Sequence, residues 1–279
     1  MNLSVKIKDL VLIMLMIFGL QSCSTQKNNA NPTPEPVKTV EIALEKPKNK
    51  EENCFKNAAD RPELYLPLLK NKTVAIVANQ TSLLADKTHL VDFLVQNNIK
   101  IKHIFAPEHG FRGTADAGEH VKNGIDTKTG LPIISLYGDN KKPKSEQLQG
   151  VDIVLFDIQD VGVRFYTYIS TLTYVMEATA ESGKEIIVLD RPNPHDGYTD
   201  GSVLKEKWTS FVGLHKVPVV YGLTIGEYGK MVNGEKWMKN AAQVKYTLIP
   251  MLNYHKNKRY PISEKPSPNL PNDQSINLY

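Results

Sequence analysis

Residues 106–113, APEHGFRG, place a carboxylate, an imidazole and a guanidinium within five positions of the chain. Glu108, His109 and Arg112 follow directly on KIKHIF, an alternating apolar run that indicates a β-strand. Polar residues after strands also serve as ordinary caps and turns. Such turns seldom combine an acid, a base and an arginine this densely, so the stretch points to a ligand site.

Four further apolar runs end in the same way. Polar side chains follow the five runs at Asn79 and Thr81, at Glu108 and His109, at Tyr137, at Asp157, Gln159 and Asp160, and at Asp190 and Arg191. In an open parallel sheet the carboxyl ends of the strands lie along one edge, where ligands bind. We therefore expect these side chains to gather at one edge, although capping explains Asn79 and Thr81 equally well.

The elements that would position them alternate between strands and helices. Residues 151–160 are apolar almost throughout, as in a central parallel strand that is covered on both faces. We expect strands at 72–81, 100–110, 131–138, 151–160 and 184–194, and helices at 88–98, 145–150 and 165–183. This alternation is typical of βαβ units, and it predicts an α/β fold with a mostly parallel sheet flanked by helices.

The N-terminus indicates export. Lys6 and Lys8 precede an apolar run that is too short to span a bilayer and fits the hydrophobic region of a secretory signal. The sequence LQSC, ending at Cys23, resembles a bacterial lipobox, which implies a lipid anchor on Cys23 at the periplasmic face of a membrane in the cell envelope. Only Cys54 would then remain, as a small buried apolar residue or a bystander. The polar, proline-bearing stretch 24–58 predicts a disordered tether, with a short helix possible near residues 37–46.

Composition excludes some partners. The chain has 279 residues, with 34 Lys and Arg against 30 Asp and Glu, a formal net charge of +4. Its lysines are scattered and do not alternate with aromatic residues, so we expect no nucleic-acid partner. The end of the chain, SPNLPNDQSINLY, shows no obvious last element, from which we expect an incomplete second domain.

Three chemistries compete for the expected edge. Paired carboxylates flanking a bond are the equipment of glycoside hydrolysis, and nearby aromatic residues suit stacking on sugar rings. A divalent metal on His109, His120 and the acids is a second possibility, but no dense ligand spacing supports it, so we expect no metal. Ser-His-Asp hydrolysis lacks a GxSxG motif, and a dinucleotide cofactor lacks GxGxxG.

Several long motifs resemble the exo-β-N-acetylmuramidase (NamZ-like) family from about residue 64 onward. They are VANQTSL, FAPEHGFRGTADAGEHV, DTKTGLPIISLYG, VDIVLFDIQDVGVRFYTYISTL, VLDRPNPHDG, SFVGLHKVPVVYGLTIGEYG and PSPNLP. The resemblance implies a Rossmann-like catalytic domain, here residues 59–222 after a signal peptide at 1–23, and the beginning of a smaller C-terminal domain at 223–279. It also implies an exo-acting, cofactor-free hydrolase that releases N-acetylmuramic acid from the non-reducing end of peptidoglycan fragments.

The same resemblance suggests which residues act. Glu108 in PEHG is the first catalytic candidate, followed by Glu119 in AGEH and by Asp160. Arginine matches a carboxylate in a bidentate fork, so arginines are candidates to bind the lactyl carboxylate of the sugar. The expected substrate-binding set is His109, Arg112, Tyr137, Arg164, Tyr166, Asp190, Arg191 and Asn193.

Two alternatives stay open. A tethered α/β domain also suits a non-catalytic lipoprotein that captures a cell-wall sugar, and a truncated product would be inactive. Retaining, inverting and substrate-assisted mechanisms differ in the distances between groups, which a sequence does not contain.

Overall fold

The computed structural model describes residues 40–41, 54–112 and 123–279. The expected signal peptide with Cys23, most of the expected tether, and Glu119 lie outside these residues. Residues 37–279 form one compact unit. Within the described ranges, none of the helices has both the length and the apolar character needed to cross a membrane.

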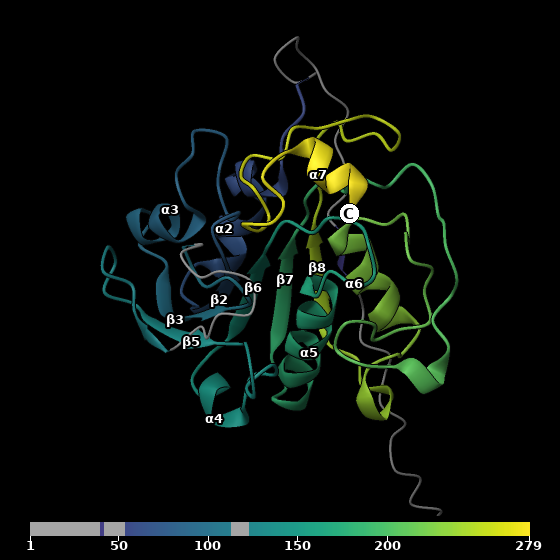
Figure 1. The fold of residues 1–279 in the computed structure, drawn as a ribbon. Coiled ribbons are helices and arrows are strands. Elements are labelled where there is room, and N and C mark those ends of the chain that lie inside the picture. The colour runs from purple at the N-terminus through teal and green to yellow at the C-terminus, as the bar shows by residue number, and fades with distance from the viewer. Residues whose placement is uncertain (1–39, 42–53, 113–122) are drawn as a thin grey trace, which may run out of the picture. The chain divides into compact units, whose positions relative to one another are not determined.

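A mostly parallel sheet of eight strands forms the centre of this unit, in the order β1-β8-β7-β6-β2-β3-β5-β4 (Figure 1). Among the pairings of these described strands, only that of β4 with β5 is antiparallel. The strands are β1 (Val40–Glu41), β2 (Thr73–Ala78), β3 (Lys100–Ala106), β4 (Gly124–Ile125), β5 (Pro132–Ser135), β6 (Ile153–Asp157), β7 (Glu185–Leu189) and β8 (Lys245–Ile249).

Helices cover both faces of the sheet (Figure 1). The helices of the described residues are α2 (Pro62–Leu69), α3 (Leu90–Gln96), α4 (Ser145–Leu148), α5 (Tyr168–Glu181), α6 (Ile225–Gly234) and α7 (Asp273–Leu278). Short 3₁₀ turns lie at Ala58–Asp60, Glu206–Trp208 and Lys239–Ala241.

The strand residues alternate between two separate cores. Val154 and Phe156 of β6 belong to the core that α5 and α6 cover, whereas Ile153 and Leu155 belong to the core that α2 and α3 cover. Successive side chains of a strand point to opposite faces, so a strand buried on both faces must be apolar at every position. This explains the unbroken apolar run at 153–156.

The predicted α/β fold is confirmed. The five expected strands correspond to β2, β3, β5, β6 and β7, and the three expected helices to α3, α4 and α5. The observed strands are shorter than expected because their polar ends form loops instead of continuing the ladder. These loops carry the candidate residues.

The C-terminal part of the chain departs from the expectation. The boundary expected between residues 222 and 223 lies in the connection before α6 and would divide the sheet, because β8 pairs in parallel with β7 and α6 packs against α5. Asp190 also accepts hydrogen bonds from the start of α6. Residues 225–249 therefore complete the α/β unit.

Two smaller expectations need correction. Cys54 is exposed, not buried. Val40–Glu41, where a helix was considered possible, is a short strand beside β8.

Candidate active site

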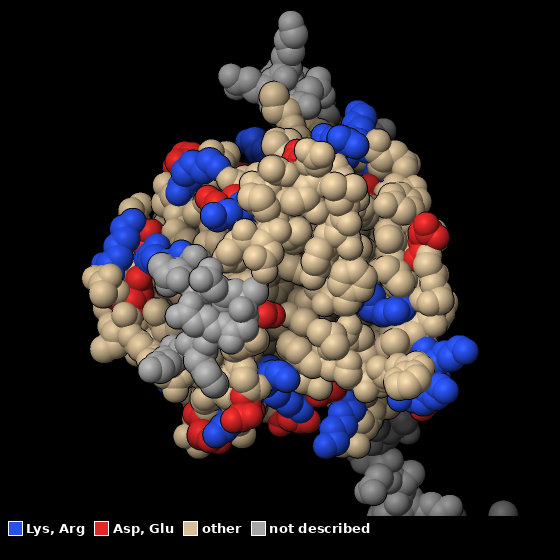
Figure 2. All heavy atoms as spheres, viewed as in Figure 1, with Lys and Arg blue, Asp and Glu red and all other residues tan. Residues whose placement is uncertain are grey.

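A cavity of about 220 Å³ lies at the carboxyl end of β3, beside the N-terminal end of α5. Its walls come from the loop after β3, the start of α5, the loop near residue 212 and the C-terminal segment. The lining residues are Glu108, His109, Phe165, Tyr166, Thr167, Tyr168, Val212, Ser267, Asn269 and Tyr279. We call it the Glu108 cavity. Figure 2 shows the face that carries α5 and α7, where charged side chains lie mainly around the margin.

A tight turn presents Glu108 to this cavity. The Gly110 amide donates to the carbonyl of Pro107 at 3.1 Å. His109 has φ of 71°, a left-handed conformation that is uncommon outside glycine. The Tyr168 hydroxyl donates to the backbone carbonyl of Glu108 at 3.4 Å, and the Asn79 amide donates to Tyr168 at 2.9 Å. The turn is thus held from two neighbouring elements.

The Glu108 carboxylate is half-buried and has protein partners. Thr167 Oγ1 donates to Glu108 Oε2 at 3.3 Å. The pKa of the Tyr137 phenol is raised by desolvation first, and then by the charge and hydrogen bonding of Glu108 beside it. A carboxylate among hydroxyl groups, in a cavity walled by aromatic rings, has the chemistry of a glycosidase acid, base or nucleophile.

Asp160 lies behind the wall of the cavity and does not line it. Its Oδ2 accepts from the Tyr221 hydroxyl and, at 2.8 Å, from the Gly162 amide, whereas its buried Oδ1 has no partner among the described residues. Burial raises the pKa of Asp160 to about 6. Burial first, and the Asp160 charge in addition, raise the pKa of Tyr166 and of Tyr168, which do line the cavity.

Arg191 forms a buried ion pair with Asp157. Its Nε and Nη2 donate to the two oxygens of Asp157 at 2.5 and 2.8 Å, and both side chains are at most 1% exposed. Nη2 also donates to the carbonyl of Leu83 at 3.1 Å. Arg191 therefore joins the ends of β6 and β7 to the loop after β2 and does not line the Glu108 cavity.

The other two arginines also have protein partners. Arg164 Nη1 donates to the carbonyls of Ser202 and Val217, at 2.8 and 2.6 Å. Arg112 forms a bidentate pair with Asp126, at 2.9 and 2.8 Å, and contacts Asp92 at 3.1 Å. The described wall of the Glu108 cavity accordingly contains no Lys or Arg.

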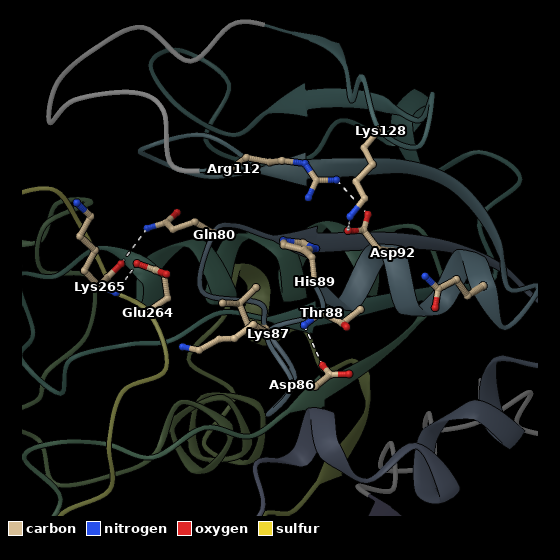
Figure 3. Close-up of a pocket in the computed structure, with 12 residues that line it drawn as sticks. Gln80, Asp86, Lys87, Thr88, His89, Asp92, Arg112, Lys128, Glu264 and Lys265 are labelled. Atoms are coloured by element: carbon tan, nitrogen blue, oxygen red, sulfur yellow. Dashed lines mark hydrogen bonds and ion pairs between the residues drawn. The ribbon is translucent and has the colours of Figure 1, made fainter.

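Arg112 lines a second, larger space of about 630 Å³ beyond the loop after β2. Figure 3 shows Arg112 and Lys128 converging on Asp92, with His89 beneath them. The Glu264–Lys265 segment closes the far side, where Gln80 Nε2 donates to the carbonyls of Lys265 and Pro266. Arg112 and Lys128 both pair with Asp92 in its wall, and Glu108 does not line this space.

The remaining candidates connect loops of the same edge. Asp190 accepts from Thr224 Oγ1 at 2.8 Å and from the Gly226 amide at 2.9 Å, and burial raises its pKa to about 7. Asn193 Nδ2 donates to the carbonyl of Leu223 at 2.8 Å. Tyr166 does line the cavity, and its hydroxyl donates to the carbonyl of Pro266 at 2.9 Å.

The structure thus brings four candidates, Glu108, His109, Tyr166 and Tyr137, to or beside one cavity. It adds lining residues that the sequence did not single out, among them Thr167, Ser267 and Asn269. The sequence could have indicated them, because Thr167 lies in the motif RFYTYISTL and the other two lie in PSPNLP, and both stretches carry the family resemblance. Among the described residues, no group of three or more His, Cys, Asp or Glu side chains could hold a metal ion.

The chain is similar to proteins of a known family. The family model described as "Exo-beta-N-acetylmuramidase NamZ, N-terminal" matches residues 74–274. Peptidoglycan beta-N-acetylmuramidase NamZ of Bacillus subtilis is 42% identical over 221 residues, which cover 77% of this chain and 52% of that protein.

Two crystal structures of DUF1343 family proteins from Bacteroides fragilis share the fold. One has a TM-score of 0.73 at 43% identity and covers 81% of this chain and 60% of its own. The other has a TM-score of 0.72 at 34% identity and covers 80% of this chain and 57% of its own. The chain thus spans between about half and three fifths of these relatives.

Proposed function

We propose a glycosidase function for this chain from one premise: it belongs to the exo-β-N-acetylmuramidase NamZ N-terminal family. The proposed reaction is release of N-acetylmuramic acid from the non-reducing end of peptidoglycan fragments, in cell-wall turnover or recycling. The name of the Bacillus subtilis relative, a peptidoglycan beta-N-acetylmuramidase, supports the reaction class and the substrate. The chain spans 52% of that relative, so the activity of the whole protein belongs to the proposal.

One observation carries it: the Glu108 carboxylate enters a small cavity with aromatic walls at the carboxyl edge of the sheet. Glycoside hydrolysis needs a carboxyl group that can give a proton to the leaving oxygen or take one from water. We assign that role to Glu108. The exposed ring of Phe165 is placed to stack on a sugar, and the side chains of Ser267 and Asn269 can hydrogen-bond its hydroxyl or acetamido groups.

The experiment is incubation of the chain with the disaccharide of N-acetylmuramic acid and N-acetylglucosamine, followed by product analysis. We expect free N-acetylmuramic acid, and no release from the corresponding disaccharide that lacks the lactyl group at its non-reducing end. Saturable, stoichiometric binding without product would favour the alternative, a cell-wall sugar-binding lipoprotein. The Bacillus subtilis relative, assayed in parallel, shows that the conditions support turnover.

We also propose that the protein is exported and lipid-anchored through Cys23 in the bacterial cell envelope. The basic and apolar N-terminus and the LQSC sequence support this assignment. Expression of the chain and of Cys23→Ala in a bacterium fed an alkyne fatty acid tests it. Label on the chain but not on the variant is expected, and equal labelling would contradict the anchor.

A further inference from the structure

Thr167 occupies the N-cap position of α5 without acting as a cap. Threonine at this position usually has an extended backbone and accepts a hydrogen bond from an amide in the first turn. Thr167 has φ of −78° and ψ of −1°, in the helical region, and its side chain makes no capping hydrogen bond. Stabilisation of the helix end therefore does not explain its hydroxyl.

The hydroxyl is directed at the Glu108 carboxylate instead. Thr167 Oγ1 donates to Glu108 Oε2 at 3.3 Å, and the next residue, Tyr168, donates to the Glu108 carbonyl at 3.4 Å. Two consecutive residues thus hold both the backbone and the carboxylate of Glu108. Tyr168 is itself fixed by Asn79, and α5 is packed along the core for most of its length.

We propose that Thr167 is a positioning residue that fixes the Glu108 carboxylate for catalysis, an inference that rests on the proposed glycosidase function. A carboxyl group that exchanges a proton must lie within hydrogen-bond reach of the reacting oxygen. Glu108 sits on a loop and has several rotatable bonds, so without the Thr167 donor its carboxylate, with Tyr137 beside it, would sample more rotamers. Small misplacements of catalytic groups are costly in rate.

The test compares Thr167→Val, which removes the hydroxyl at nearly constant volume, with Thr167→Ser, which retains it. The matched control is Thr179→Val on the same helix, whose hydroxyl is buried and donates to the carbonyl of Val175 at 2.7 Å. We expect kcat on the disaccharide to fall about 10- to 100-fold in Thr167→Val, the range for one lost hydrogen bond to a charged group. KM should stay nearly constant, and Thr167→Ser should restore most of kcat.

A second readout does not depend on turnover. In protein labelled with ¹³C at the glutamate carboxyl carbons, the Glu108 signal is assigned by its absence in Glu108→Gln. It should move in Thr167→Val and stay in place in Thr167→Ser and Thr179→Val. An unmoved signal, a kcat equal to wild type in Thr167→Val, or an equal loss in the control would overturn the inference. Absence of turnover in the wild-type chain would instead contradict the proposed function and, with it, the catalytic meaning of the contact.

Discussion

At the scale of single residues, most arginines at this edge of the sheet serve the fold. Arg191 and Asp157 form a bidentate pair with almost no solvent exposure. Removing one partner of such a pair leaves an uncompensated buried charge, which costs far more than loss of an exposed pair. The sequence analysis correctly predicted that Arg191 and Asp157 lie at this edge of the sheet. It assigned Arg191 to the substrate, whereas Arg191 pairs with Asp157.

We therefore expect Arg191→Met to lower the free energy of unfolding by about 3–5 kcal/mol, because the Asp157 charge is left unpaired. Lys245→Met is the control, since Lys245 pairs with Glu185 where both side chains are about half exposed. The control should cost at most about 1 kcal/mol. Urea unfolding measures both variants, and equal losses would show that burial does not decide the contribution of these pairs.

Asp160 makes the stability depend on pH. Burial raises its pKa to about 6 in the folded chain, against about 4 for an exposed aspartate. Between these values the unfolded chain loses the proton while the folded chain keeps it, so folding becomes less favourable as pH rises. The loss of folding stability begins near pH 4, is complete above about pH 6, and is absent below both pKa values.

Asp160→Asn should remove this dependence, because the amide does not ionise and keeps an oxygen for Tyr221 and Gly162. Relative to wild type, the variant should gain up to about 3 kcal/mol between pH 4 and pH 7. Urea unfolding at several pH values measures the difference between the two proteins, in which the contributions of other carboxylates cancel. A difference independent of pH would contradict the account.

At the scale of elements, the position of the site follows from the alternation of strands and helices. The polar ends of β3, β6 and β7 could be assigned to one edge because parallel strands present their carboxyl ends together. The sequence analysis did not predict β8, because its sequence, KYTLI, is short and carries two polar residues. Whether a side chain lines the cavity or a neighbouring loop depends on partners far apart in sequence, such as Arg191 with Asp157 or Thr167 with Glu108.

The loops after β6 and β7 approach each other closely at Gly162. Gly162 has φ of +81°, and an added Cβ would lie 1.9 Å from Asn193 Oδ1. Asn193 cannot easily give way, because its side chain bonds the carbonyl of Leu223 and the amide of His195.

Gly162→Ala should therefore lower the free energy of unfolding by about 1–3 kcal/mol, through backbone strain and the clash. The control is Gly124→Ala, where a Cβ meets nothing within 4 Å and φ is not positive. It should change stability by less than about 0.5 kcal/mol. Thermal unfolding of the two variants would contradict this reasoning if both melted at the same temperature.

At the scale of the whole molecule, the described residues supply a site with one exposed flank. Phe165, Val212 and Tyr279, which line the Glu108 cavity, are each at least about one third exposed. The chain spans 52% of the Bacillus subtilis relative. Sequence motifs were enough for the family, whereas the order of carboxylate roles depends on a bound sugar and its distances.

The central claim is that Glu108 performs the acid–base chemistry, and Glu108→Gln tests it most directly. Turnover of the disaccharide by the variant and by wild type should be measured beside their thermal melts. The account predicts a loss of about 100-fold or more in turnover, with an unchanged melting temperature because Glu108 is half-buried and makes no ion pair among the described residues. Turnover near that of wild type would contradict it and remove Glu108 from the chemistry.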